Sequence, residues 1–90
     1  MDDEHTYTIE TYSIDWSAPV QQITTPIYSD VLSVRVYGDH LCISCLCAST
    51  GTTRKRTVEI LRQGMNYQLP KGVFINTVEI AGHVLHVFCD

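Results

Sequence analysis

The sequence predicts a small all-β domain, a single antiparallel β-sandwich or barrel of six to seven short strands with little or no helix. Two observations lead to this prediction. Short runs rich in Val, Ile, Thr and Tyr, which suit a pleated and half-buried surface, alternate with turn residues along the chain. No window of useful length repeats its apolar residues at the helical period. Short strands at this spacing are typical of sandwiches and small barrels.

Length and composition indicate one globular domain over residues 1–90, with a flexible N-terminal segment 1–4. The 44% of hydrophobic residues is too high for a disordered chain. The formal net charge of -4 argues against a nucleic-acid partner, because phosphate binding needs a positive surface. The acidic start is unlike a secretory signal, and no stretch approaches the roughly 18 apolar residues of a membrane span. We therefore expect a cytoplasmic protein with reduced cysteines and no membrane partner.

The first two predicted strands cover residues 5–14 and 20–24. The segment 15–19, which ends in a proline, breaks the first strand. Pro26 marks a sheet edge or a turn after the second strand, because proline has no N–H for a strand ladder.

The clearest pair of strands covers residues 31–37 and 40–48. Gly38 and Asp39 stand between them, and a two-residue connection of this type is the mark of a tight β-hairpin. The second arm is apolar at nearly every position. A strand with two apolar faces is expected to lie centrally and to be covered on both sides.

Three further strands complete the prediction. After a polar Ser-Thr-Gly turn, residues 54–62 return as a less hydrophobic strand. Residues 63–72 form the longest irregular connection. The last pair covers 73–81 and 83–89, with a turn at Gly82.

The cysteines raise the question of a metal site, because the spacing between Cys42 and Cys45 is that of a zinc knuckle. Side chains alternate along a strand, so Cys45 and Cys47 should share one face while Cys42 points to the other. Ile43 and Ser44 also make a poor turn. Free cysteine commonly packs as a small hydrophobe, so we expect core cysteines and no metal. The alternative is a metal site formed by Cys42, Cys45, Cys47, His86 and Cys89.

No catalytic constellation is apparent, and we expect neither an enzyme nor a cofactor. A cysteine nucleophile needs an exposed thiolate near a base, and nothing in the pattern places a cysteine on a loop. His86 shares a strand face with Val84 and Phe88, where a histidine is usually a hydrogen-bonded structural residue. The carboxylates are scattered over turns and strands rather than paired for acid–base chemistry.

The basic cluster of the sequence leaves three interpretations open. Arg54, Arg56 and Arg62 share one face of a predicted strand, with Val58 and Ile60 between them. They either protect a sheet edge from aggregation, bind an acidic protein partner, or grip nucleic-acid phosphates. The chain has no glycine-rich phosphate cradle and no interleaved aromatic platform, which argues against nucleic acid.

The order of these strands and their residues resembles a family of small phage- and prophage-encoded all-β proteins of unknown function. The likeness extends from about Thr6 to the C-terminus, and its specific segments are 31–34, 41–43, 56–60, 74–78 and 84–88, with Gly82 before the last. The closing His-Val-Phe is the most specific element. The resemblance implies an origin and a fold, but no mechanism.

The chain departs from the family pattern at two places. Residues 61–66 stand where a Gly-Thr-Gly-His loop is expected, and Ser44 stands where a tryptophan is expected. If that loop carries a function common to the family, this chain lacks it.

A phage-derived cytoplasmic β domain without catalytic residues is best interpreted as an interaction protein of the infected or lysogenic host cell. We expect a host or phage protein as partner, with inhibition of a host defence or metabolic system as one such role. Aromatic and arginine side chains contribute most of the energy at protein interfaces. The candidate partner-binding residues are Trp16, Tyr28, Arg54, Arg56, Arg62 and Tyr67. An equally supported role for Trp16 is to cap the open end of the sandwich.

Three other outcomes stay open at this stage. A homodimer through an exposed strand edge is one. A small-ligand protein that binds or sequesters a nucleotide is another, with residues 63–72, Arg62 and Lys71 as its wall. A structural virion component, which would form large homo-oligomers, is the third.

Overall fold

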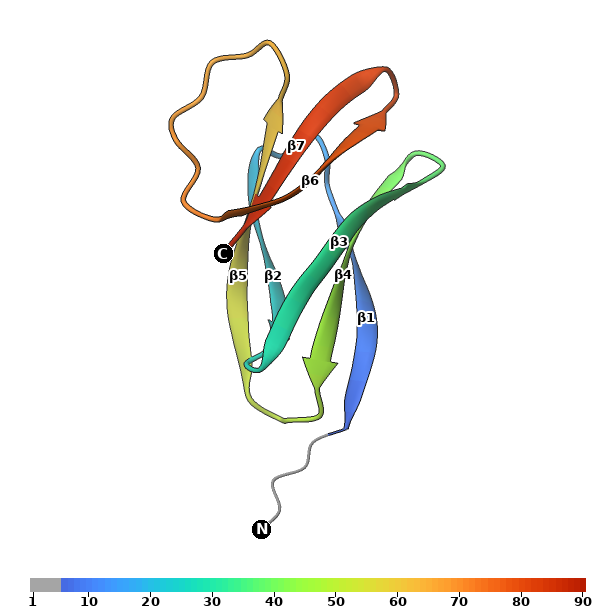
Figure 1. Cartoon of the computed structure of the whole chain (residues 1–90), viewed down its shortest axis with the longest axis vertical. Coiled ribbons are helices and arrows are strands. Elements are labelled where there is room, and N and C mark those ends of the chain that lie inside the picture. The colour runs from blue at the N-terminus through green and yellow to red at the C-terminus, as the bar shows by residue number, and fades with distance from the viewer. Residues whose placement is uncertain (1–5) are drawn as a thin grey trace.

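The computed structural model describes residues 6–90, and the predicted flexible segment 1–4 lies outside this range. Seven strands make up the fold (Figure 1): β1 Tyr7–Ile14, β2 Val20–Pro26, β3 Ser29–Tyr37, β4 His40–Ala48, β5 Thr53–Arg62, β6 Val73–Ile80 and β7 His83–Cys89. Between residues 6 and 90 there is no helix, and hence none with the length and apolarity to cross a bilayer.

The strands form two antiparallel sheets that face each other (Figure 1). One sheet has the order β1-β4-β3 and the other the order β2-β5-β7-β6. The all-β prediction is confirmed, and of its two forms the structure has the sandwich, because the sheets are separate rather than closed into a barrel.

Two hairpins have the tight turns that their sequences favour. In the β3–β4 hairpin Tyr37 pairs with His40, and Gly38 has a φ of 65° at the first turn position, as a type II′ turn requires. In the β6–β7 hairpin Ala81 and Gly82 have φ values of 51° and 80°. Two positive φ values define a type I′ turn, so Ala81 belongs to the turn and not to the predicted strand.

The core lies between the sheets and is supplied by alternate residues. Leu41, Ile43 and Cys45 of β4 are at most 1% exposed and face the second sheet, which contributes Val58 and Val87. The prediction that β4 is central is confirmed, since it pairs with β1 and β3. The prediction that it is covered on both faces is wrong. Its outward residues are only half-buried, because the sandwich has two layers and β4 lies in one of them.

Asn76 joins the two sheets where the edge strands β3 and β6 lie side by side. Its side-chain Oδ1 accepts a hydrogen bond from the Val34 N–H at 2.8 Å, and its Nδ2 donates to the Val34 carbonyl at 3.0 Å. The pairing of β6 with β7 is irregular between Phe74 and Asn76, which lets this side chain turn toward β3. The Asn76 amide thus gives the N–H and the carbonyl of Val34 the hydrogen bonds that a neighbouring strand would otherwise supply.

Replacing Asn76 with alanine leaves both polar groups of Val34 without this partner. We expect Asn76→Ala to lower the free energy of unfolding by about 1–3 kcal/mol, measured by urea denaturation. Asn66→Ala is the matched control, because Asn66 is exposed in the 63–72 connection, and its expected effect is within about 0.5 kcal/mol. Equal effects of the two substitutions would contradict the bridging role.

Candidate functional site

The candidate site arises where β5 extends past β2 on one side while it stays paired with β7 on the other. Residues 53–59 of β5 pair with β2, whereas residues 58–62 pair with β7. The last residues of β5 therefore extend past the start of β2. The space beside them is bordered by the β1–β2 connection and by the long β5–β6 connection. We call these two connections, residues 15–19 and 63–72, the loop end of the molecule.

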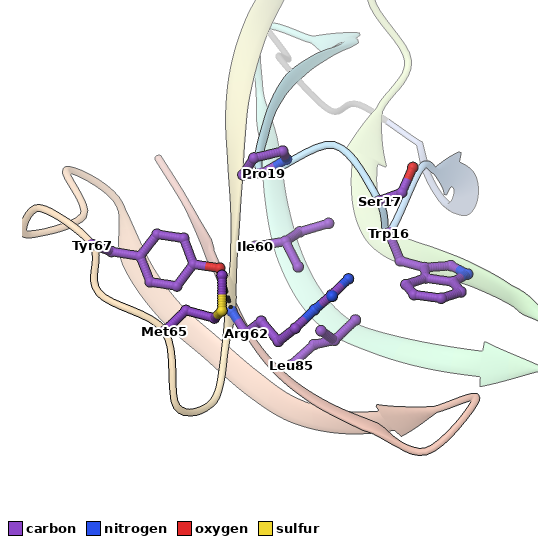
Figure 2. Close-up of a pocket in the computed structure, with 8 residues that line it drawn as sticks. All are labelled: Trp16, Ser17, Pro19, Ile60, Arg62, Met65, Tyr67 and Leu85. Carbon is purple, nitrogen blue, oxygen red and sulfur yellow. Dashed lines mark hydrogen bonds between the residues drawn. The ribbon is translucent and has the colours of Figure 1, made fainter.

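A pocket of about 200 Å³ opens between the two connections (Figure 2). We call it the end pocket, and its lining residues are Trp16, Ser17, Pro19, Ile60, Arg62, Met65, Tyr67 and Leu85. Ile60 and Leu85 are buried residues from the inner faces of β5 and β7. The pocket is thus the unfilled end of the space between the two sheets, with an aromatic ring on either side of it (Figure 2).

Hydrogen bonds hold the β5–β6 connection in place over the pocket. The Arg62 N–H donates to the Tyr67 hydroxyl at 3.0 Å, and the Gln63 N–H donates to the Val84 carbonyl at 2.9 Å. At the far end of the connection, the Gly72 N–H donates to Glu59 Oε1 at 3.2 Å. A side chain at Gly72 would bring its Cβ to 2.6 Å from the Cys89 carbonyl carbon, so only glycine fits.

The β1–β2 connection is fixed by Asp15 and by the ring of Trp16. The Asp15 carboxylate accepts hydrogen bonds from the Ser17 hydroxyl at 2.6 Å and the Ser17 N–H at 3.0 Å, and these bonds lower the Asp15 pKa. The Trp16 ring packs against the core and lies 5.6 Å from the His83 ring, centroid to centroid. Trp16 therefore caps the open end of the sandwich, as one of its two predicted roles requires.

Arg62 is the charged group of the end pocket. Its side chain is half-buried and runs between Ile60 and Leu85 toward Trp16 (Figure 2). Within residues 6–90, the guanidinium has neither a hydrogen-bond acceptor nor a carboxylate within ion-pair distance. It thus differs from Arg56, whose charge is fully engaged.

Arg56 is buried inside the sandwich, at 7% exposure. Its guanidinium donates to Thr25 Oγ1 at 3.2 Å, to the Asp90 carbonyl at 2.6 Å, and to the hydroxyl and carbonyl of Ser29. Arg56 had been predicted as a partner-binding residue because alternation groups it with Arg54 and Arg62. The grouping is right, but the shared face is the inner one. Each of its three nitrogens donates to an internal acceptor, so Arg56 is not a surface anchor.

Tyr28, Arg54 and Arg56 line a different hollow, together with residues at the start of β3. Arg54 is within 3.7 Å of the Asp90 carboxylate. Residues 53–57 pair with β2 on one side only, so this basic segment lies at a local sheet edge, as the edge interpretation requires. The six predicted residues therefore split into two groups of three, and only Trp16, Arg62 and Tyr67 share a pocket.

The residues of the alternative metal site are spread over three surfaces. Cys45 and Cys47 face the core from β4, and Cys89 faces it from β7, whereas Cys42 lies on the outer face of the first sheet. His86 lies on the outer face of the second sheet, where Thr77 Oγ1 and Gln63 Oε1 contact its ring nitrogens at 2.8 and 3.0 Å. No three His, Cys, Asp or Glu side chains of residues 6–90 are grouped to hold a metal ion.

Two of the inward cysteines, Cys45 and Cys89, are held in the neutral thiol form. Burial raises the pKa of Cys45 to about 11, and the nearby Cys47 adds to the rise. Burial also raises the pKa of Cys89. Because the folded pKa of Cys45 exceeds its ordinary value of 9.0, the unfolded chain loses this proton first. The stability that the neutral thiol contributes is therefore present below about pH 9 and lost as pH rises toward 11.

Alkylation of the folded protein by iodoacetamide at pH 7 tests this assignment, because only thiolates react. We expect Cys42, half-buried on an outer face, to be modified while Cys45 and Cys89 stay unmodified, as measured by peptide mass spectrometry. In urea all four cysteines should react. Modification of Cys45 in the folded protein at the rate of Cys42 would contradict the assignment.

Sequence patterns identified part of the end pocket. Aromatic and arginine residues beside predicted loops pointed to Trp16, Arg62 and Tyr67. Met65 was missed because an isolated methionine in an irregular connection carries no periodicity. Pro19 was seen only as a strand breaker, and its lining role follows from the Ile60 N–H bond to its carbonyl at 2.8 Å.

Comparisons with known proteins identify no relative of the chain: no family model matches it, and no curated protein or solved structure is significantly similar to it.

Proposed function

We propose that this protein is a non-enzymatic binding domain that recognises a host or phage protein through its loop end. The observation that carries the proposal is the end pocket, whose volume of about 200 Å³ suits one side chain of a partner. Pockets for small molecules usually enclose about 300–1,000 Å³. A partner side chain inserted there would be the kind of buried anchor on which protein interfaces depend.

Exposed apolar side chains surround the pocket and supply the contact area that such a partner needs. Leu69 is 91% exposed, Met65 60% and Tyr67 42%. Tryptophan, tyrosine, methionine and arginine are the residue types enriched at interfaces, and all four are present at this end. Covering them would remove apolar surface from water, which stabilises the complex.

The structure gives less support to a nucleotide-binding role. Arg62 and Lys71 had been predicted to form one wall, but Lys71 lines a separate hollow beside Glu59 and Asp90. A phosphate in the end pocket would therefore meet one cation instead of two. A wider hollow of about 460 Å³ is lined by residues of the segment 61–70 and by His86. Both ring nitrogens of His86 already have hydrogen-bond partners, so the ring has no free nitrogen to offer a nucleotide.

A binding role also agrees with the chemistry of the cysteines. Nucleophilic catalysis requires a thiolate, and burial keeps Cys45 and Cys89 neutral at physiological pH. The resemblance to phage-encoded proteins leads us to propose a host defence or metabolic protein as partner, and occupation of its surface would inhibit it.

Affinity capture from a lysate of the host bacterium tests the proposal. The double variant Met65→Ser/Leu69→Ser should lower the affinity for the captured partner by about 10- to 100-fold, because it removes exposed apolar contacts. The matched control is Ile9→Ser/Leu32→Ser, which alters two exposed apolar residues of β1 and β3 and should bind as the wild type does.

Thermal unfolding of both variants serves as the folding control, and their melting temperatures should agree with that of the wild type. Two results would refute the proposal. One is that only the control variant loses binding. The other is that the wild type captures every protein no better than the Met65→Ser/Leu69→Ser variant does.

A further inference from the structure

From the state of Arg62 we infer that the partner inserts an aspartate or glutamate side chain into the end pocket. This inference rests on the proposed function and specifies the chemistry that the loop end recognises.

Among residues 6–90, no carboxylate serves as a counterion for Arg62. The chain has six lysines and arginines, all within the described residues. Arg35, Arg54, Lys55 and Lys71 are exposed, and Arg56 is bonded internally. Arg62 is the one cation of residues 6–90 that is half-buried in a pocket without a protein acceptor. A partner that covers the pocket removes the water around this charge, so it must replace that water with an acceptor.

Two carboxylates at the loop end and on β5, those of Asp15 and Glu59, form hydrogen bonds with other groups and not with Arg62. Asp15, in the β1–β2 connection, accepts both hydrogen bonds from Ser17. Glu59, on the outer face of β5, accepts the N–H groups of Lys71 and Gly72 at 2.9 and 3.2 Å. The acceptor for Arg62 is therefore expected from the partner.

The shape of the pocket favours a carboxylate on a short aliphatic stem. A guanidinium presents parallel N–H groups that match the two oxygens of a carboxylate. The walls next to it are apolar or aromatic, from Ile60, Leu85 and Trp16 (Figure 2). Methylene groups of an aspartate or glutamate would contact these walls while the carboxylate reaches Arg62. A nucleotide would need more room than about 200 Å³ and a second cation.

The acidic net charge of -4 does not oppose this recognition. At physiological ionic strength, charges separated by more than about 8 Å are largely screened. An ion pair formed inside the covered pocket is screened much less. The contact between Arg62 and the carboxylate therefore outweighs the net charge of the protein.

A displayed library of random heptapeptides, selected on the full-length protein, provides the test. Trp16 is the only tryptophan of the chain, so its fluorescence reports directly on the end pocket. We expect the selected peptides to share an aspartate or glutamate and to change this fluorescence. Replacing that residue by its amide should weaken binding about 10- to 100-fold.

Variants of the protein then connect the peptide carboxylate to Arg62. Arg62→Gln should cause the same loss of affinity, and the amide peptide should cause little further loss in this variant, as in a double-mutant cycle. Arg62→Lys should restore part of the affinity, because it keeps the charge without the planar fork. Arg35→Gln removes an exposed arginine of β3 and should leave binding within twofold of the wild type.

The outcomes separate this inference from the proposed function. Peptides that change Trp16 fluorescence but share no acidic residue would overturn the inference and leave the binding role in place. Tighter binding of adenosine monophosphate than of the best acidic peptide, reported by Trp16, would overturn both in favour of a small anionic ligand. A library that yields no peptide acting on Trp16 would also overturn both.

Discussion

The inward-facing row of β5 is the constraint on which the rest of the structure depends. Arg54, Arg56, Val58, Ile60 and Arg62 occupy alternate positions, so one strand sends all five side chains toward the other sheet. The two apolar residues in the middle are buried in the core. A guanidinium can enter this space only where acceptors meet it, as at Arg56, or where the sandwich opens to solvent, as at Arg62. The strand register therefore determines which arginine is structural and which is available.

The same alternation separates the buried cysteines of β4 from the groups that the loop end exposes. Every second residue of β4 faces the core, which buries Cys45 and Cys47 and separates them from Cys42. Side chains that stay accessible to a partner lie at the ends of the strands, in and beside the connections. At the loop end, two fixed connections hold apolar and aromatic groups around one free charge. Rigid strands that present a binding end through their connections are a common arrangement in β-sandwiches.

The strands could be predicted from the sequence, but the contacts between the two sheets could not. The β3–β4 hairpin was predictable because Gly38 and Asp39 select a two-residue turn. The burial of Arg56 was not, since its acceptors come from β2, β3 and the C-terminal Asp90, and no local pattern shows which distant segments meet. Alternation placed Arg62 on the right face, but its pocket depends on where β2 begins relative to the end of β5. For the same reason the amide bridge of Asn76 has no signature in the chain.

The central claim is that two arginines on one face of one strand are in opposite states, and the side-chain Nε–H exchange of the arginines measures this directly. In ¹⁵N-resolved NMR of the free protein, the Arg56 Nε–H should exchange slowly with water, because it donates to Thr25 Oγ1 in the interior at 3.2 Å. The Arg62 Nε–H should exchange as rapidly as that of the exposed Arg35. Protection of Arg62 comparable to that of Arg56 would show that its charge is already satisfied within the chain, and would contradict the account.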